Sequence, residues 1–516
     1  MLVTTFGSAV YGVEAITITI EVNWIATQGK DPMIVGLPDN AVKESLQRIE
    51  STFKTNDYTF PRTKVVVNMA PADIRKSGTA FDLPIALGIL GASDQIENAE
   101  ALSRYVIMGE LSLNGEIRPI KGALPIAIQA RKEGFKGLIV PKVNAKEAGM
   151  VNQLQVFGVG HIREVIEFFS KDEQGLEPVI INTREEFFNS QYDFEIDFSE
   201  VKGQENIKRA LEIAAAGGHN AILIGPPGAG KTMLAKRLPT ILPPLSLQEA
   251  LETTKIHSVA GKLPENSTLI SKRPFRSPHH TISDVALVGG GGIPQPGEIS
   301  LAHNGVLFLD ELPEFKRTVL EVMRQPMEER RVTISRAKVA VDFPASFMLM
   351  ASMNPCPCGY YNHPDRECSC PPGAVQKYLN KISGPLLDRI DLHVEVTPVA
   401  FSELSAIRPA EQSAAIRDRV IRARDRQAER YKDHPGVYCN AQMSSKMLKE
   451  ICVINTVGAN LLKVAMEKLN LSARAYDRIL KVSRTIADLS QSEEIRPEHL
   501  AEAIQYRSLD REGWAG

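Results

Sequence analysis

The stretch that decides the fold is GPPGAGKT, residues 225–232. An apolar run at 220–224 precedes it, and a helical pattern begins at Lys231. Closely spaced glycines let backbone N–H groups turn inward around phosphate oxygens, and a helix that follows presents its positive end to the same charge. Because strand, loop and helix stand in this order, the spacing predicts a nucleotide-phosphate loop.

The residue types in this loop divide the chemistry between them. The Lys231 ammonium can contact the β- and γ-phosphates, and the Thr232 hydroxyl can bind Mg²⁺. The residues expected to bind the nucleotide are Gly225, Pro226, Pro227, Gly228, Ala229, Gly230, Lys231 and Thr232.

A second apolar run, at 304–309, ends in the two acids Asp310 and Glu311. A buried strand with this ending places one carboxylate beside the metal and the other beside the attacking water. We assign Asp310 to Mg²⁺ in the cofactor site and Glu311 to polarising the water. Together the two stretches predict an ATPase.

Size and composition narrow the class of protein. A chain of 516 residues exceeds one hydrophobic core, so two or three domains are expected. The net charge of −2 excludes a uniformly basic particle, although a ring could still gather cations in its channel. Glu14 interrupts the apolar N-terminal stretch, and no apolar run reaches about 18 residues. We therefore expect a cytoplasmic protein without a membrane partner.

Patterning divides the chain into four parts of an α/β multidomain protein. Residues 1–170 mix β-rich runs with helical stretches, and 171–198 form a polar, acidic linker. Strand and helix patterns alternate over 199–400, which indicates a parallel sheet covered by helices. Residues 401–516 have an almost entirely helical pattern.

The phosphate loop, the strand that ends in two acids and a further strand pattern that ends in Asn354 together resemble the AAA+ core. The resemblance implies that Asn354 is sensor 1, which helps to hold the water. The stretch LLDRID at 386–391 resembles the arginine-finger segment, so Arg389 would reach a neighbouring subunit's ATP. SARA at 472–475 matches sensor 2, which makes Arg474 a γ-phosphate contact. The alternative for both arginines is a solvated side chain or a salt bridge within the subunit.

The AAA+ resemblance extends to two insertions. Residues 273–292, with the pair His279-His280, resemble the helix-2 insert of the magnesium-chelatase and MCM branch, and the alternating stretch 331–345 resembles its pre-sensor hairpin. In the replicative relatives such loops face the ring channel and contact DNA, which implies phosphate contacts by Arg336 and Lys338 at the hairpin tip. The alternatives are an exposed turn for the hairpin and, for the histidine pair, metal binding, nucleic-acid binding or subunit packing.

Four cysteines cluster directly after Asn354. Two C-x-C pairs flank a short loop, and thiolates in such pairs can share one tetrahedral Zn²⁺. The predicted ligands are Cys356, Cys358, Cys368 and Cys370. The alternative is four reduced cysteines without a metal, because a disulfide is uncommon in the cytosol.

The N-terminal part resembles the proteolytic domain of Lon, an α+β domain of the ribosomal S5 type. The matching stretches are KSGTAFDLPIA at 76–86, GELSLNG at 109–115 and IRPIKG at 117–122. That chemistry needs a serine activated by a lysine. Ala80 stands at the serine position and Leu124 at the lysine position, so no peptidase activity is expected. A shifted dyad of Ser77 and Lys121 is the alternative.

A degenerate Lon-like domain, a chelatase-type AAA+ core with a Cys₄ insertion and a C-terminal helical lid together resemble the ComM/YifB family. The resemblance implies a ring oligomer, most often a hexamer, that uses ATP and Mg²⁺ to move along single-stranded or branched DNA. Such a helicase would migrate DNA branches during homologous recombination, notably in natural transformation. The alternatives are a magnesium-chelatase-type motor subunit and a Lon-like ATP-dependent protease.

Overall fold

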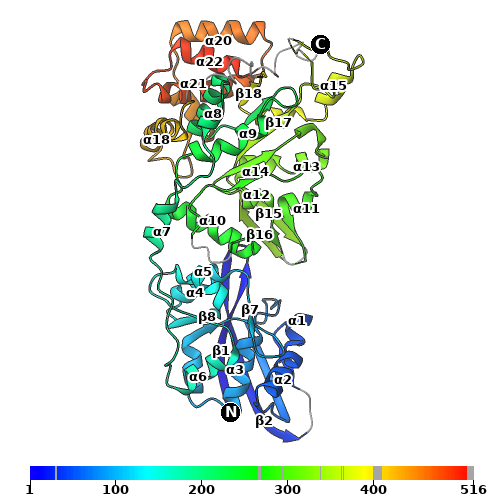
Figure 1. Ribbon diagram of the computed structural model, residues 1–516, viewed down its shortest axis with the longest axis vertical. Coiled ribbons are helices and arrows are strands. Elements are labelled where there is room, and N and C mark those ends of the chain that lie inside the picture. Colours follow the sequence, from blue (N-terminus) through cyan, green and yellow to red (C-terminus); the bar gives the residue numbers. More distant parts are fainter. Residues whose placement is uncertain are drawn as a thin grey trace. The chain divides into compact units, whose positions relative to one another are not determined.

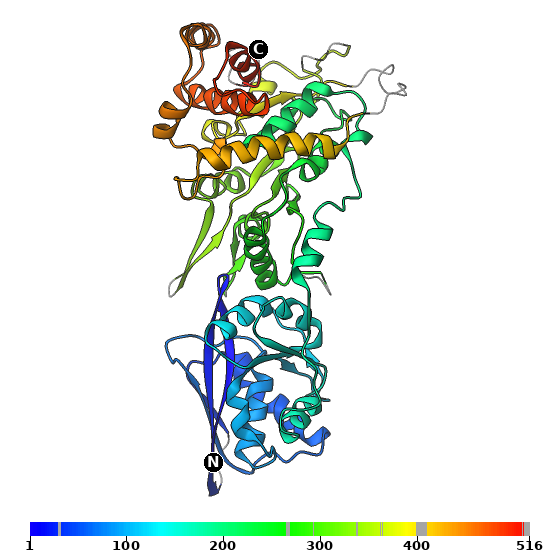
Figure 2. The same cartoon turned by 90° about the vertical axis from the view of Figure 1, so that its left-hand side faces the viewer.

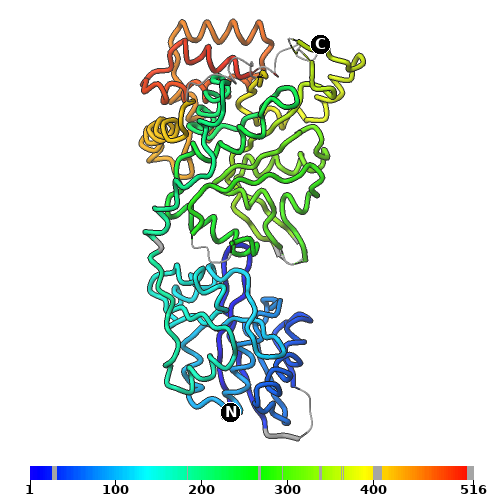
Figure 3. Tube along the Cα trace, viewed as in Figure 1, coloured from blue at the N-terminus to red at the C-terminus, as the bar shows by residue number. Residues whose placement is uncertain are grey.

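The chain folds into two compact units of mixed α/β structure (Figure 1). The computed structural model describes residues 1–28, 32–264, 269–292, 294–336, 339–361, 363, 365–398, 410–507 and 509. Unit 1 comprises Met1–Asn189, Leu247–Ser271 and Pro294–Pro296. Unit 2 comprises Ser190–Ser246, Lys272–Ile293 and Gly297–Gly516. The chain therefore leaves and re-enters unit 1, as the trace in Figure 3 allows the reader to follow.

A seven-stranded sheet with the order β3-β4-β2-β1-β5-β8-β9 forms the centre of unit 1. The β1–β2 and β2–β4 pairs are antiparallel and the others are parallel. Alternation along β2 buries Ile18, Ile20 and Val22 on one face, as the period of a strand requires. The strands of this sheet are β1 (Leu2–Tyr11), β2 (Glu14–Gln28), β3 (Met33–Val35), β4 (Thr63–Ala70), β5 (Tyr105–Ile107), β8 (Gly137–Pro141) and β9 (Gln155–Val159). The short strands β6 (Glu110–Leu111) and β7 (Ile117–Arg118) pair antiparallel in a separate two-stranded sheet.

The helices of unit 1 lie mostly within residues 1–170, where the sequence predicts helical stretches among β-rich runs. Every residue of α3 is buried, which explains why its sequence is apolar on all sides. The helices are α1 (Asn40–Lys43), α2 (Ser45–Thr55), α3 (Asp82–Ala92), η1 (Ala99–Arg104), α4 (Ala123–Lys132), η2 (Lys142–Asn144), α5 (Ala145–Gly149) and α6 (Ile162–Ser170). Helix α7 (Thr183–Ser190) lies within the stretch predicted as a linker.

Helix α10 (Leu247–Ala260) belongs to unit 1, although its sequence lies between the phosphate loop and the acidic strand. The Ser258 hydroxyl donates to the buried carboxylate of Glu147. The Gly122 N–H donates to the Ser258 carbonyl at 3.2 Å, and Lys255 pairs with Glu14 at 3.1 Å. The helix is thus held to α4, α5 and the β1–β2 hairpin by polar contacts.

Unit 2 is built on the predicted parallel sheet, with the order β11-β14-β17-β10-β18. The strands are β10 (Ala221–Ile224), β11 (Phe275–Arg276), β14 (Val306–Leu309), β17 (Met348–Met353) and β18 (Leu392–Glu395). The predicted hairpin forms from β15 (Arg331–Arg336) and β16 (Val339–Pro344), which pair antiparallel. The insert between β11 and β14 contains the short strand β12 (Gly289–Gly290) of unit 2 and the short strand β13 (Gln295–Pro296), which belongs to unit 1.

Helices surround this sheet. Those that precede residue 388 are η3 (Phe198–Glu200), α8 (Glu205–Gly217), α9 (Lys231–Arg237), η4 (Leu238–Ile241), α11 (Asp284–Val288), α12 (Glu298–Leu301), η5 (Leu312–Glu314), α13 (Arg317–Glu321), α14 (Arg324–Glu329), α15 (Ala374–Leu379) and α16 (Gly384–Leu387). Among the described residues, no helix combines the length and the apolarity that a membrane crossing requires.

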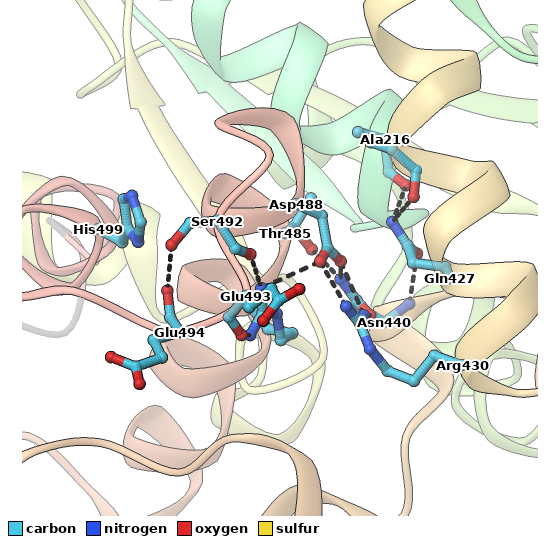
Figure 4. Close-up of polar contacts among 12 residues, drawn as sticks. Ala216, Gln427, Arg430, Asn440, Thr485, Asp488, Ser492, Glu493, Glu494 and His499 are labelled. Atoms are coloured by element: carbon cyan, nitrogen blue, oxygen red, sulfur yellow. Dashed lines mark hydrogen bonds and ion pairs between the residues drawn. The ribbon is translucent and has the colours of Figure 1, made fainter.

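The C-terminal part of unit 2 is helical, as its sequence predicts. It contains α18 (Ser413–Arg430), η6 (Asn440–Gln442), α19 (Ser445–Ile451), α20 (Thr456–Lys468), α21 (Ala473–Leu489) and α22 (Pro497–Gln505); α18 is the long helix seen from the side in Figure 2. Buried polar contacts join these helices to α8 and to one another (Figure 4): Gln427 of α18 donates to the Ala216 carbonyl of α8 at 3.0 Å, and Asn440 of η6 donates to Asp488 of α21 at 2.8 Å. Arg430 pairs with the same Asp488 carboxylate.

Candidate nucleotide site

The phosphate loop leaves the carboxyl end of β10, which lies between β17 and β18 in the sheet. Ligands of open parallel sheets bind at this edge of the strands. Gly230 is the N-cap of α9 with a φ of 83°, a left-handed conformation that glycine adopts readily. The loop and the start of α9 therefore have the backbone geometry that the sequence predicts.

Lys231 is buried, and its ammonium group joins the phosphate loop to the neighbouring strand. It donates to the carbonyls of Gly225 and Pro226 at 2.7 and 2.9 Å and to the Asn354 side-chain oxygen at 3.0 Å. Burial lowers the pKa of Lys231, while the carboxylates of Asp310 and Glu311 oppose this shift. The predicted phosphate-binding lysine and the predicted sensor residue are thus in direct hydrogen-bond contact.

The metal-ligand candidates also converge. The Thr232 hydroxyl donates to an Asp310 carboxylate oxygen at 2.8 Å, and Ser352 on β17 donates to the other oxygen. A hydroxyl and a carboxylate are oxygen ligands of the kind that Mg²⁺ prefers. Sequence reasoning missed Ser352, although its polar side chain in an otherwise apolar strand was a signal.

Glu311 directly follows Asp310 but points into a different environment. Its φ is 55°, a strained conformation for a residue other than glycine, and its side chain is 57% exposed. The His280 Nδ1 atom lies 3.9 Å from the Glu311 Oε2 atom, and the His279 and His280 rings are 4.1 Å apart. The histidine pair, whose role the sequence left open, thus lies beside the predicted catalytic carboxylate.

The four cysteines that follow Asn354 in the chain come together in space. All four sulfur atoms lie within 4.8 Å of one another, and three of the separations are 3.3, 3.5 and 3.7 Å. Tetrahedral Zn²⁺ with bonds of about 2.3 Å would place its sulfur ligands about 3.8 Å apart. Burial opposes ionisation of Cys358, but hydrogen bonds from the backbone of Tyr360 and from the Cys356 thiol lower its pKa to about 6. The cluster is compatible with a structural zinc site.

The cysteine loop also contacts the phosphate loop. Gly359 has a φ of 85°, and a Cβ atom at this position would lie 2.6 Å from the Pro227 Cδ atom. Only glycine fits this approach without displacing the neighbouring proline. The geometry of the cysteine loop is therefore linked to that of the nucleotide site.

The two candidate arginines have partners within their own chain. Arg389 pairs with Glu328, and its side chain is 16% exposed. Arg474 is 71% exposed and pairs with Asp388 at 2.5 Å. These contacts are the intrasubunit salt bridges that the sequence left as an alternative. The roles of both arginines toward ATP stay predictions.

The candidate DNA contacts belong to the β15–β16 hairpin. Lys338 and the side chain of Arg336 lie outside the described residues, so their contacts stay predictions. One face of the hairpin is buried through Val332 and Phe343. The backbone of Arg336 pairs with Val339 at the end of the ladder.

Unit 1 contains the positions at which Lon carries its serine and lysine. Leu124 is buried, and its N–H donates to Glu147 at 2.9 Å. Lys121 packs against Gly261, and among the described residues no hydrogen bond joins it to Ser77. Ala80 has no nucleophilic atom. The described residues therefore offer no assembled serine–lysine pair.

Comparison with known proteins assigns the family. Three family models match: "Magnesium chelatase, subunit ChlI" over 197–404, "Subunit ChlI of Mg-chelatase" over 20–144 and "Magnesium chelatase, subunit ChlI C-terminal" over 410–507. The competence protein ComM of Haemophilus influenzae is 44% identical over 513 residues, which cover 99% of this chain and 98% of that protein. The chain belongs to the ComM/YifB family of magnesium-chelatase-like proteins.

Other relatives support this assignment. The YifB protein of Escherichia coli K12 is 43% identical over 511 residues, which cover 98% of this chain and 96% of that protein. Lon protease 2 of Bacillus subtilis is 32% identical over 154 residues, 27% of this chain and 26% of the protease. Membership of the ComM/YifB family indicates an AAA+-type ATPase that uses ATP and Mg²⁺.

Proposed function

We propose that this member of the ComM/YifB family is an ATP-driven DNA motor. It works in the cytoplasm as a ring oligomer, with a hexamer as the expected form, and migrates branched DNA during homologous recombination and natural transformation. The observation that carries the proposal is the similarity to competence protein ComM, which is 44% identical and covers 99% of this chain.

The side chains of the site would divide the work of ATP hydrolysis. Lys231 would hold the phosphates, and its hydrogen bond to Asn354 would fix the sensor side chain beside them. Thr232 and Asp310 would hold Mg²⁺, which when bound offsets the negative charge of the phosphates. Glu311 would orient the attacking water, because its exposed carboxylate is free of Asp310's hydroxyl partners.

Two arginines would complete the site. Arg389 would reach the ATP of a neighbouring subunit and stabilise charge that develops there, and Arg474 would contact the γ-phosphate. The β15–β16 hairpin, with Arg336 and Lys338, would grip the DNA phosphates without reading sequence. The four-cysteine cluster would hold Zn²⁺ and fix the loop that contacts Pro227.

The decisive experiment is steady-state ATP hydrolysis by the full chain, with and without single-stranded and forked DNA. Strong stimulation by DNA that Lys231→Ala abolishes, and that weakens steeply as salt is raised, supports the motor. A strand-displacement assay on forked DNA then follows. Hydrolysis that is indifferent to both DNA substrates contradicts the proposal.

A magnesium-chelatase motor is the second candidate, because all three matching family models carry that description. It predicts ATP hydrolysis that responds to a chelatase partner and not to DNA. A Lon-like protease is disfavoured by Ala80 and Leu124, and casein degradation that a Ser77→Ala variant loses would be needed to support it.

A further inference from the structure

Exposed lysines of unit 1 lie on segments that the fold brings together. The segments 117–132, 134–146 and 253–264 contain lysines and arginines but no aspartate or glutamate. Because the whole chain has a net charge of −2, this composition is a local property of the surface. We define the lysine patch as the exposed side chains of Lys121 before α4, Lys142 in η2, Lys146 in α5 and Lys262 after α10.

Hydrogen bonds join the three segments to one another. The Asn144 side chain accepts from the Ile120 N–H and donates to the Ile120 carbonyl, both at 2.9 Å, so Lys121 is held beside η2 and α5. The Gly122 N–H donates to the Ser258 carbonyl at 3.2 Å, which brings the end of α10 to the same place. Figure 1 shows α4 and α5 next to each other in unit 1.

The Lys121 side chain packs on the end of α10. A Cβ atom at Gly261 would lie 2.9 Å from the Lys121 Cε atom, so the aliphatic part of Lys121 lies on this glycine. Lysine side chains pack along a surface in this way while the ammonium group stays in water. The next residue is Lys262, whose N–H donates to the His257 carbonyl at 2.9 Å. Lys121 and Lys262 therefore belong to one surface.

Acidic side chains do not neutralise the patch. Among the described residues, no ion pair or hydrogen bond joins the ammonium group of any of the four lysines to another group. The acids in contact with the three segments bind other groups: Glu14 pairs with Lys255 at 3.1 Å, Glu110 with Arg118 at 3.3 Å and Glu133 with Gln129 at 2.5 Å. Glu147 is buried and accepts the Leu124 N–H at 2.9 Å. The positive charge of the patch is thus available to a ligand.

A phosphate backbone is the ligand that this arrangement fits. Duplex DNA carries one negative charge about every 1.7 Å along its axis, and lysines contact its phosphates without reading bases. Because hydrogen bonds hold the segments of the patch together, little backbone order has to be gained when the ammonium groups meet a row of phosphates. Protein–protein interfaces are depleted in lysine, so an acidic polypeptide fits the patch less well.

We infer that the lysine patch of unit 1 binds the phosphate backbone of the DNA on which the motor acts. The inference rests on the proposed DNA motor, to which it adds a contact in unit 1 besides the hairpin of unit 2. Contacts of this kind position DNA and add no sequence preference.

The salt dependence of DNA binding tests the patch. Anisotropy of a labelled duplex is measured with the full chain and a non-hydrolysable ATP analogue, between about 50 and about 200 mM salt. The patch variant carries Lys121→Gln, Lys142→Gln and Lys146→Gln. Each lost phosphate contact lowers the slope of log affinity against log salt by about 0.9. With one patch on the DNA, wild-type affinity should therefore fall about 40-fold more over this range than that of the patch variant.

Two further variants separate the patch from charge in general. The control variant, with Lys43→Gln, Lys54→Gln and Arg62→Gln, loses the same charge from exposed residues of unit 1 outside the patch and should keep the wild-type slope. Arginine at the three patch positions retains the charge and should keep it too. If the patch variant melts at a lower temperature than the control variant, the three single substitutions replace it, each lowering the slope by about 0.9.

The outcomes distinguish the patch from the motor. A wild-type slope in the patch variant overturns the inference and leaves the motor standing, because DNA would then bind elsewhere on the chain. An equal loss of slope in the control variant also overturns it. So does labelled polyglutamate that binds the wild type but not the patch variant while DNA binding is unchanged, since the surface would then bind an acidic polypeptide. If the wild type binds no DNA, both the inference and the proposed function fall.

Discussion

Unit 2 should lose stability between pH 7 and pH 5, while unit 1 should not. Two histidines of unit 2, His219 and His393, are fully buried. Burial lowers the pKa of His219 despite the Asp391 carboxylate beside it, and burial together with the Arg507 guanidinium places the pKa of His393 well below its usual range. Both side chains therefore bind protons less readily in the folded protein than in the unfolded chain.

The sign and size of the effect follow from proton linkage. A histidine whose pKa is lower in the folded state destabilises the protein as the pH falls through its unfolded pKa, about 6.5, because protons then favour the unfolded chain. A histidine that stays neutral when folded costs up to about 2 kcal/mol at pH 5, so two cost up to about 4 kcal/mol. This is a large part of the roughly 5–15 kcal/mol that stabilises a domain.

Unit 1 contains shifts of the opposite sign. Burial raises the pKa of both Asp82 and Glu147, although Arg48 opposes the first shift and Ser258 the second. A carboxyl group with a raised pKa binds protons more tightly when folded, so its contribution to stability improves as the pH falls toward that pKa. The difference between the free energies of unfolding of the two units should therefore grow as the solution is acidified.

Urea unfolding at pH 7, 6 and 5 measures this, with pulsed hydrogen–deuterium labelling and mass spectrometry to assign peptides to each unit. His219→Gln should reduce the loss in unit 2 by up to about 2 kcal/mol at pH 5, since one titrating group is gone. His434→Gln removes an exposed histidine and should leave the loss unchanged. The reasoning would be refuted if both units lost the same free energy of unfolding between pH 7 and pH 5, or if unit 2 of His219→Gln lost as much as unit 2 of the wild type.

Three further predictions concern the four-cysteine cluster, Gly359 and helix α10. Purified protein should contain about one zinc ion per chain, measured by atomic emission. The Cys356→Ser variant should lose the zinc, and the Cys439→Ser variant, which changes a buried cysteine outside the cluster, should retain it. Wild-type protein without zinc would contradict the metal site. Gly359→Ala should raise the KM for ATP several-fold without abolishing hydrolysis, because its Cβ would lie 2.6 Å from a proline of the phosphate loop; an unchanged KM would mean that this contact does not shape the site. Ser258→Ala should destabilise unit 1 by about 1–3 kcal/mol because it removes a donor from the buried Glu147 carboxylate, and faster amide exchange in α10 is the measurement that checks it.

Local chemistry explains which parts of the structure could be predicted from the sequence. The phosphate loop, the acidic end of β14 and the β15–β16 hairpin depend on residues that are close in the chain, where turn geometry and periodicity carry the signal. The Cys-x-Cys pairs are similar, because each pair brings two sulfur atoms together within three residues. The parallel sheet followed from the alternation of these local elements.

Contacts between distant residues were not predictable in the same way. Glu147 and Ser258 are 111 positions apart, and nothing near Ser258 indicates that α10 folds with unit 1. Arg474 and Asp388, 86 positions apart, each belong to a recognisable motif, but their pairing depends on how α21 packs. His280 illustrates the same limit, because its sequence shows an exposed histidine pair and only the fold places it beside Glu311.

The placement of α10 has a mechanical consequence for the proposed motor. Residues 247–271 fold with unit 1, yet unit 2 supplies the chain on both sides of them, at 190–246 and 272–293. The two units are therefore joined covalently at several points, and a single hinge at residue 189 cannot absorb a displacement between them. The phosphate loop and α9 lie in the unit 2 segment that directly precedes α10, and Ser258 of α10 donates to Glu147 of unit 1. In the proposed motor, unit 1, which carries Ala80 and Leu124 at the serine and lysine positions of Lon, would receive the motion of unit 2 through this covalent connection.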